Sequence, residues 1–325
     1  MARIFSLKPK TLYHWYRNYL SAYNPDKDSG VWHPKYLENI DMETGEITKG
    51  KPLYVFKPEN IGERMSIDDK AIGHEGFTIL SNADTGKIAM MVESCKSAEV
   101  GDAISQFGTD LQKVKNISCD MAASYLLVCS EELPQAKVVI DKFHVMQYVY
   151  DAVLDVRRRI KKELSSNLSK GKVKTQQDKA ILFQLDLLRQ TRYRLTQSPH
   201  KWSDAGKEVM DSAFCNHPQL KTAYDLAQAF KKWYAIENIY IKNSQTITAD
   251  LHRWYYNVND TKLDEFRSVL KMIRKHENEI LNFFICGQTN AKAERINGKI
   301  NRFISNNYGM KDKDFALYRT ALYFS

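Results

Sequence analysis

The sequence lacks the features that mark disulfide-rich, zinc-ribbon and membrane proteins. Its 325 residues include only five cysteines, and none of them forms a CxxC pair. This spacing argues against a zinc ribbon or a disulfide framework and favours a reducing cytoplasm. No apolar run approaches the ~20 residues that a membrane-spanning helix needs, and no signal-peptide pattern is present. The sequence also has no clear internal repeat and no low-complexity linker.

The sequence has no acidic excess either. It contains 48 Lys and Arg against 39 Asp and Glu, for a net charge of +9 and a pI of about 9.1. A basic bias of this size favours a polyanionic partner. Hydrophobic residues make up 43% and charged residues 27%, a composition that allows a sizeable core and does not indicate disorder. The length suits two domains, or one large domain with an insertion.

Two short apolar runs, each ending in an aspartate, lie near the middle of the chain. Residues 114–119 precede Asp120, and residues 136–140 precede Asp141, with helical spacing between them. Continuous apolar runs bounded by turn signals are typical of buried strands. Ligands and catalytic groups gather at the carboxyl ends of strands in open α/β sheets. Asp is also a common helix N-cap, so at this point each aspartate is either a site residue or a cap.

Three further strands are predicted upstream, at residues 65–69, 77–81 and 87–95, followed by a helix at 97–111. The short turns between them, including NADTG, predict an antiparallel meander. The resulting order, β-β-β-α-β-α-β-α, is the topology of the RNase H fold, in which carboxylates of the first and fourth strands lie side by side. Here those carboxylates are Asp68 and Asp120. We therefore expect an α/β fold with an RNase H-like mixed sheet flanked by helices.

The remainder of the chain is predicted to be mainly helical. A long helix at 145–164 leads into a run, from 157 to 174, with eight Lys or Arg and one acid. Such a run is either a solvated face or a phosphate-binding surface, and its candidate DNA contacts are Arg157, Arg158, Arg159, Lys161 and Lys162. Residues 175–288 show helical periodicity and no convincing strand. Their aromatic residues are interpreted as the core of a helical domain, although one or two could stack on unpaired bases.

The segment 289–306 combines an apolar stripe with a polar stripe that carries Glu294, Asn297 and Asn301. Cations surround its single acid: Lys292, Arg295, Lys299 and Arg302. Taken alone, Glu294 would be an ordinary surface residue of a helix. A final helix is predicted at 312–324. At the other end, residues 9–23 form either an amphipathic helix that packs on the body or a small DNA-recognition helix, followed by a hairpin pattern at 40–51.

Several short motifs occur in a fixed order along the chain. They are Ser66-Ile67-Asp68-Asp69, Gly73-His74, Asp120-Met121 with Tyr125, Pro134-x-Ala136, Asp141-Lys142-Phe143-His144-Val145, Ala293-Glu294-Arg295-Ile296-Asn297 and Tyr308-Gly309. In this order the chain resembles DDE transposases of bacterial insertion sequences, specifically the ISL-three type. The resemblance covers roughly residues 64–164 and 288–324. The DxFHV and AExxN segments are specific in combination, although either alone would be weak.

The resemblance implies a catalytic triad of Asp68, Asp120 and Glu294 that binds Mg²⁺ or Mn²⁺, as two ions, and cleaves and joins DNA phosphodiesters. Carboxylates are preferred ligands of such hard cations, and two ions can clamp an in-line phosphoryl displacement. Asp141, His144 and Asn297 would be accessory residues near the site, with His144 either positioning DNA or filling the core. Successive strand residues face opposite ways, so only one of Asp68 and Asp69 can face the site, and the motif favours Asp68.

The resemblance also predicts the domains and partners. Residues 1–63 are expected to form an N-terminal helical and hairpin extension that is a candidate for DNA contact. Residues 64–164 would form the first part of the RNase H-like catalytic core, and residues 289–325 its C-terminal helices. Between them, residues 165–288 would form an α-helical insertion before the catalytic glutamate helix. The expected partner is double-stranded DNA, as terminal inverted repeats and target, bound by a homodimer at the nucleoid in a bacterial cytoplasm, without a membrane.

Family members often begin with a zinc ribbon and a helix-turn-helix. Here the first cysteine is Cys95, so a separate DNA-binding subunit is a further hypothesis. Three alternatives remain open. The protein could be a structure-specific nuclease of the same fold, a catalytically silent DNA-binding protein derived from a transposase, or a helical interaction protein whose carboxylates are caps and surface charges.

Overall fold

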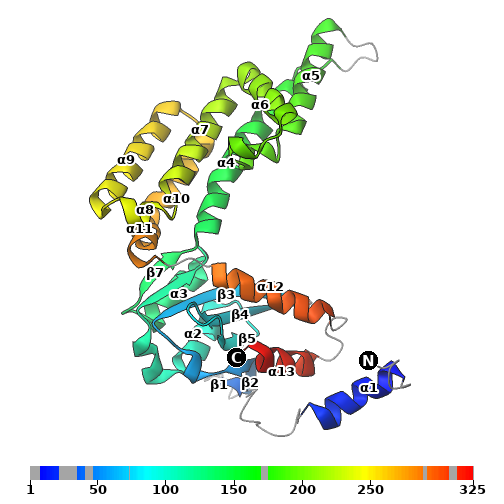
Figure 1. Cartoon of the computed structure of the whole chain (residues 1–325), viewed down its shortest axis with the longest axis vertical. Coiled ribbons are helices and arrows are strands. Elements are labelled where there is room, and N and C mark those ends of the chain that lie inside the picture. Colours follow the sequence, from blue (N-terminus) through cyan, green and yellow to red (C-terminus); the bar gives the residue numbers. More distant parts are fainter. Residues whose placement is uncertain are drawn as a thin grey trace. The chain divides into compact units, whose positions relative to one another are not determined.

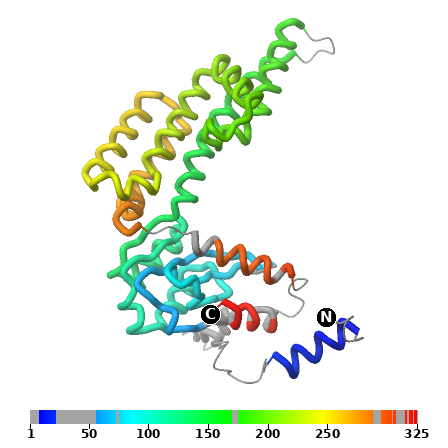
Figure 2. The backbone as a smooth tube through the Cα atoms, in the orientation of Figure 1, coloured from blue at the N-terminus to red at the C-terminus, as the bar shows by residue number. Residues whose placement is uncertain are grey.

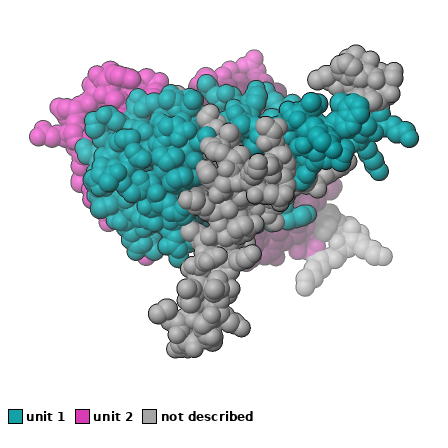
Figure 3. Space-filling view, turned by 90° about the horizontal axis from the view of Figure 1, so that it is seen from below, with its two compact units in different colours: residues 1–141, 288–325 teal, residues 142–287 magenta. Residues whose placement is uncertain are grey.

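The computed structural model describes residues 8–21, 35–40, 47–72, 74–169, 175–287, 291–306 and 313–324. It divides into two compact units. One consists of Met1–Asp141 together with Gln288–Ser325, and the other of Lys142–Gly287, as coloured in Figure 3. The chain therefore leaves the first unit, builds the second and returns, and Figure 2 shows its C-terminal segment in the same body as its N-terminal half.

The first unit is built on a mixed β-sheet. Its strands are β1 (Lys35–Ile40), β2 (Ile47–Phe56), β3 (Arg64–Ile72), β4 (Glu75–Asn82), β5 (Ile88–Val92), β6 (Asn116–Cys119) and β7 (Lys137–Ile140). Among the described residues they form a seven-stranded sheet in the order β1-β2-β5-β4-β3-β6-β7. The meander β3-β4-β5 is antiparallel, and β6 and β7 run parallel to β3. The predicted RNase H-like order of strands is confirmed.

The N-terminal hairpin of β1 and β2 continues this sheet, because β2 pairs antiparallel with β5. The sequence pattern predicts a hairpin in this region but not its attachment to the sheet. Attachment depends on hydrogen bonding to a strand more than thirty residues further along the chain, and β5 would otherwise leave an unpaired edge.

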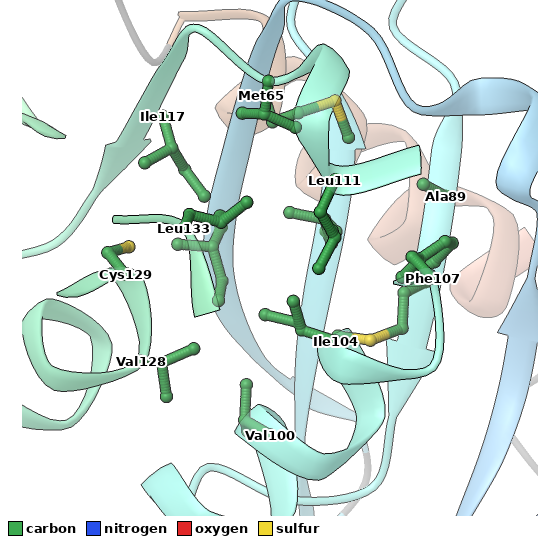
Figure 4. Packing of buried hydrophobic residues seen from close by; sticks show 14 of the residues in the cluster. Met65, Ala89, Val100, Ile104, Phe107, Leu111, Ile117, Val128, Cys129 and Leu133 are labelled. Atoms are coloured by element: carbon green, nitrogen blue, oxygen red, sulfur yellow. The ribbon is translucent and has the colours of Figure 1, made fainter. Parts of the chain in front are cut away.

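Helices cover both faces of the sheet (Figure 1). On one face, α2 (Ser97–Ser105) and α3 (Ala123–Glu132) bury Val100, Ile104 and Val128 in one cluster with strand residues such as Met65, as Figure 4 shows in detail. On the other, α12 (Ala291–Asn306) and α13 (Lys313–Phe324) form a second core. Because side chains of a strand alternate between faces, β3 contributes to both cores.

The helix predicted at 97–111 is shorter in the structure. It ends at Ser105 and is followed by a 3₁₀ segment, Gly108–Lys113. Gly108 adopts a left-handed conformation with φ of 53°, which glycine reaches without the steric cost that a Cβ brings. This conformation interrupts the helical hydrogen-bonding pattern at a point that the apolar periodicity does not reveal.

The N-terminal helix packs on the first unit. It comprises α1 (Pro9–Trp15) and a π-helical turn, η1 (Tyr16–Leu20). Tyr13 and Tyr16 lie edge-on to Phe315 of α13, with ring centroids 5.9 and 5.7 Å apart, and the Tyr318 hydroxyl donates to the Ser21 carbonyl at 2.9 Å. This packing agrees with the first of its two interpretations, an amphipathic helix on the body.

The second unit is helical. Its helices are α4 (Lys142–Ser166), α5 (Gln176–Gln190), α6 (Asp204–Asn216), α7 (Pro218–Trp233), α8 (Asn238–Ile241), α9 (Ser244–Thr261), α10 (Asp264–Lys275) and α11 (Glu277–Cys286). Trp233 and Trp254 are buried, and their indole nitrogens donate to the carbonyls of Ile247 and Leu226 at 2.9 Å. These aromatics form the core, as the sequence pattern indicates. Tyr193, Tyr240 and Tyr256 are exposed instead.

The helical unit begins earlier than residue 165, the start that the sequence pattern predicts. The helix α4 is continuous from Lys142, and its apolar face is buried along its length by residues such as Val149, Val153 and Val156. This face packs against α7 and α10, so the first half of the helix belongs with the helical unit.

No helix in the described part of the chain is long and apolar enough to cross a lipid bilayer.

Candidate active site

Three aspartates follow one another across neighbouring strands at one edge of the sheet. In the parallel pairing of β3 and β6, Ser66 lies beside Ser118, so continuing this register by two residues brings Asp120 beside Asp68. In the pairing of β6 and β7, Cys119 lies beside Ile140. The amide of Asp141 donates to the Cys119 carbonyl at 2.8 Å. This bond extends the pairing of β6 and β7 to Asp141. The structure therefore brings Asp68, Asp120 and Asp141 to one edge.

The carboxylate of Asp68 is held at both oxygens. Its Oδ1 accepts from the amide of Asp69 at 3.0 Å, and its Oδ2 accepts from Nδ2 of Asn297 at 2.7 Å. Both donors are neutral, and together they fix the orientation of the carboxylate. Asn297 lies on α12 and Asp68 on β3, so this bond joins elements 229 residues apart in the sequence.

Hydrophobic packing seats α12 beside this carboxylate. Ile296 and Ile300 are buried in the same core as Ile72 of β3. Asn297 follows Ile296 directly and is half-buried at the border of that contact. The polar stripe predicted from the sequence thus lies beside the apolar stripe that anchors the helix, with Asn297 facing the sheet and Asn301 exposed.

Asp68 and Asp69 lie on opposite faces of β3, as strand alternation requires. Asp69 pairs with Thr78 of β4, whose hydroxyl lies 3.2 Å from that of Tyr125. Burial, and in addition the negative charge of Asp69, raises the pKa of both Cys95 and Tyr125. Asp69 therefore lies on the face of the sheet covered by α3, and Asp68 lies on the face covered by α12.

The structure decides between the two interpretations of Asp120. The N-cap of α3 is Ala122, which makes no side-chain capping bond. The Asp120 carboxylate instead accepts from the amide of Met121. The interpretation of Asp120 as the cap of the following helix is therefore wrong. Asp141, by contrast, is buried and immediately precedes α4, which is the position of an N-cap residue. His144 is half-buried in the first turn of α4, with its ring edge-on to Phe143.

Glu294 lies in the first turn of α12, one helical turn before Asn297. Residues three apart share a helix face, so Glu294 occupies the same face as the asparagine that bonds Asp68. Its side chain is outside the described part of the structure, as is that of Lys292. Among the side chains that are described, no group of three His, Cys, Asp or Glu forms a metal-binding cluster.

A pair of buried serines supports the carboxylates, and the sequence pattern does not identify it. Ser118 Oγ donates to Ser66 Oγ at 2.9 Å, which ties β6 to β3 two residues before Asp120 and Asp68. Both serines are about 1% exposed, so the hydroxyls satisfy each other away from water. The signal that could have revealed them is the repeated pattern Ser-x-Asp at the ends of the two strands.

The cations of α12 line one exposed stripe. Arg295, Lys299 and Arg302 are all exposed, and their spacing of four and three residues puts them on one side of the helix. The buried stripe of Ile296 and Ile300 runs beside these cations. The cations therefore lie at the border of the contact between α12 and the sheet.

The basic run of α4 is less available than its sequence implies. Arg157 is only 8% exposed, and its Nε donates to the Leu188 carbonyl at 2.7 Å. Burial, together with nearby arginines, lowers its pKa. This guanidinium holds α4 to the end of α5, so we remove Arg157 from the residues expected to contact DNA.

Arg159 and Arg158 also have acidic partners. Arg159 donates to Glu265 at 2.8 Å and lies 3.3 Å from Glu163, and these carboxylates raise its pKa. Arg158 pairs with Asp155 at 2.7 Å. Lys161 is half-buried and Lys162 is exposed. The sequence pattern identifies the cations of this helix but does not predict the carboxylates that pair with them in the folded structure.

The model of the family DDE_Tnp_ISL3, described as a transposase, matches residues 65–322. Among solved structures, the catalytic core domain of BIV integrase matches with 9% sequence identity and a TM-score of 0.20, over 47% of this chain and 82% of that one. A comparison with curated proteins gave no match.

Proposed function

This chain belongs to the ISL3-type family of DDE transposases, and from this premise we propose that it cleaves the ends of its own element and joins them to target DNA through Asp68, Asp120 and Glu294. The observation that carries the proposal is the hydrogen bond from Asn297 to Asp68. It links the strand with the first carboxylate to the helix with the glutamate. The register of β3 and β6 supports the inclusion of Asp120.

The three carboxylates suit Mg²⁺ or Mn²⁺ in their chemistry, because hard divalent cations prefer oxygen ligands and keep part of their water. We propose that Asp68, Asp120 and Glu294 would hold two such ions. When bound, the metal supplies activation of the attacking hydroxyl and stabilisation of the leaving oxygen. The donors on Asp68 would hold its carboxylate in one orientation before DNA arrives.

The reaction proposed is two successive phosphodiester displacements. In the first, water attacks a phosphorus at the element's end, and the 3′ oxygen leaves as a hydroxyl. In the second, that 3′-hydroxyl attacks a phosphorus of the target, forming the new bond and releasing a target 3′-hydroxyl. One phosphodiester forms for each one broken in the joining step, so no external energy source is required.

Cations of α12 and of the helical unit would hold the DNA backbone during these steps. On α12 the proposed phosphate contacts are Lys292, Arg295, Lys299 and Arg302, and in the helical unit they are Arg158, Lys161 and Lys162, with Arg159 limited by its acidic partners. Because two ends must be joined to one target, we propose that a homodimer acts on DNA. Accessory roles for Asp141 and His144 remain part of the proposal.

The test is a cleavage and joining assay. A labelled duplex with the element's own terminal repeat is incubated with the full chain and Mg²⁺, and Asp68→Asn is compared with Asp69→Asn. The second variant is a matched control, since Asp69 is the adjacent aspartate on the opposite strand face. We expect Asp68→Asn and Glu294→Gln to abolish cleavage and Asp69→Asn to retain it, and EDTA to abolish cleavage by the wild-type chain.

Other outcomes separate the alternatives. Cleavage without joining would favour a structure-specific nuclease of the same fold. DNA binding without cleavage, in the wild-type chain and with Mg²⁺ or Mn²⁺, would favour a silent descendant of a transposase. Loss of cleavage in Asp69→Asn with retention in Asp68→Asn would contradict the assignment of the first carboxylate.

A further inference from the structure

The helical unit contains a cavity of about 580 Å³ that the proposed chemistry does not use. It is lined by His252, Tyr255, Tyr256 and Asn259 of α9, Arg274 of α10 and Glu277 of α11. The four residues of α9 are spaced at i, i+3, i+4 and i+7 and therefore share one helix face. The volume lies within the range of ordinary ligand pockets, about 300–1,000 Å³.

A network of polar contacts fixes the planar groups of this cavity. The hydroxyl of Tyr255 donates to Glu277 Oε2 at 2.9 Å, and His252 Nε2 lies 3.0 Å from Glu277 Oε1. The rings of His252 and Tyr255 stack with centroids 5.6 Å apart, and the guanidinium of Arg274 lies 5.0 Å from the Tyr255 ring centroid. Both oxygens of Glu277 are therefore engaged, and the guanidinium of Arg274 lies over the ring of Tyr255.

Tyr256 stands apart from this network. Its side chain is 72% exposed, whereas Trp254 and Tyr255 beside it are 3% and 4% exposed. Trp254 and Tyr255 pack in the core of the unit, whereas the ring of Tyr256 presents a planar surface at the cavity and is not needed for this packing. Tyr256 and Arg274 line the same cavity, and an exposed aromatic ring together with an arginine is a combination with which proteins bind unpaired bases.

Positive charge lies along α10, whose Arg274 lines the cavity. Lys271, Arg274 and Lys275 are spaced at i, i+3 and i+4 and are all exposed, so they lie on one side of the helix. Such a row attracts phosphates. Asn259 adds an amide, a group that can pair with the edge of a base.

We propose that this cavity binds an unpaired nucleotide of DNA. The base stacks on the ring of Tyr256, and the phosphates next to it contact Arg274 and Lys271. A base within a duplex is stacked on both faces and cannot enter, so the site selects single-stranded or locally opened DNA. This inference rests on the proposed function, because it names a form of DNA that the helical unit of the transposase would hold.

The test measures binding in EDTA, so that it does not depend on catalysis. The probes are a blunt duplex and the same duplex with a single-stranded overhang that contains 2-aminopurine, whose fluorescence reports stacking. The wild-type chain is compared with Tyr256→Ala, Tyr256→Phe and Tyr193→Ala. Tyr193 is the matched control, since it is 73% exposed and has Arg192 5.6 Å from its ring centroid but does not line the cavity.

We expect the overhang probe to bind more tightly than the blunt duplex and to be quenched. Tyr256→Ala should weaken the overhang probe by about 5- to 150-fold, the equivalent of about 1–3 kcal/mol of stacking, and remove the quenching. The blunt duplex should be unaffected. Tyr256→Phe retains the ring and should bind like the wild type, as should Tyr193→Ala.

Equal affinities of Tyr256→Ala and the wild-type chain for the overhang would overturn the inference. So would an equal loss for both probes, which indicates contact with duplex DNA. This outcome is independent of the proposed chemistry. Glu294→Gln and Asp68→Asn test cleavage, and even if neither variant changed the cleavage rate, Tyr256→Ala could still lose affinity for the overhang probe.

Discussion

The hydrogen bond between Asn297 and Asp68 connects packing to the proposed chemistry, and Asn297→Ala removes its donor. The amide of Asp69 still donates to Oδ1 of Asp68, whereas the bond to Oδ2 from Asn297 is lost. The apolar contacts that seat α12, at Ile296 and Ile300, are unchanged. The substitution therefore alters the orientation of the carboxylate without displacing the helix.

The magnitude follows from the type of bond. A hydrogen bond to a charged group contributes about 1.5–3 kcal/mol. Both partners here are half-buried, so water competes and the lower value, about 1.5 kcal/mol, is appropriate. If that free energy is used to hold Asp68 in its reactive orientation, its loss slows cleavage by about tenfold.

The assay is single-turnover cleavage of a terminal-repeat duplex, measured over a series of Mg²⁺ concentrations. Asn301→Ala is the control, because Asn301 lies one turn further along α12 and is exposed. We expect Asn297→Ala to cleave about tenfold more slowly, or to require more Mg²⁺, and Asn301→Ala to match the wild type. If Asn297→Ala cleaves at the wild-type rate at every Mg²⁺ concentration, the bond stabilises the fold only and the reasoning is refuted.

Three further predictions concern stability, charge and pH. Arg157→Ala should lower the free energy of unfolding in urea by about 1–3 kcal/mol, because it removes a buried hydrogen bond from a charged donor to the Leu188 carbonyl, which then keeps its bond from the Thr191 hydroxyl. Lys162→Ala should change this free energy by less than about 0.5 kcal/mol, and equal effects of the two substitutions would contradict this assignment. Lys299→Ala should reduce the slope of log affinity against log salt by about 0.9 if the lysine contacts a phosphate of duplex DNA, and an unchanged slope in filter binding would remove it from the interface. Hydrogen bonds from neighbouring residues hold the pKa of Asp178 well below its ordinary range, so its stabilisation is complete above the unfolded value of about 3.9 and is lost as the pH falls through the folded value. Thermal melting of Asp178→Asn should accordingly show a lower Tm at neutral pH and a weaker decline below about pH 4.

Local patterns in the sequence determine most of the first unit. The apolar runs before Asp120 and Asp141 predict buried strands, and the stripe of Ile296 and Ile300 predicts the buried face of α12. These predictions succeed because strand and helix periodicity is a property of neighbouring residues, and one buried face leaves few choices of register. The order of the motifs likewise identifies the family before any coordinates are known.

Tertiary structure decides which partner each polar residue meets. The sequence alone does not tell that Arg157 is buried against Leu188, that Arg159 faces Glu265, or that Asp120 is not a helix cap. Each outcome depends on contacts between residues far apart in the chain.

The same holds for the hairpin that extends the sheet and for the cavity beside Tyr256. Composition shows how many cations and aromatic rings are present, but burial and pairing depend on which helices pack together. Periodicity specifies the face that turns inward, and only the packed structure specifies what that face, and the charges at its border, will contact.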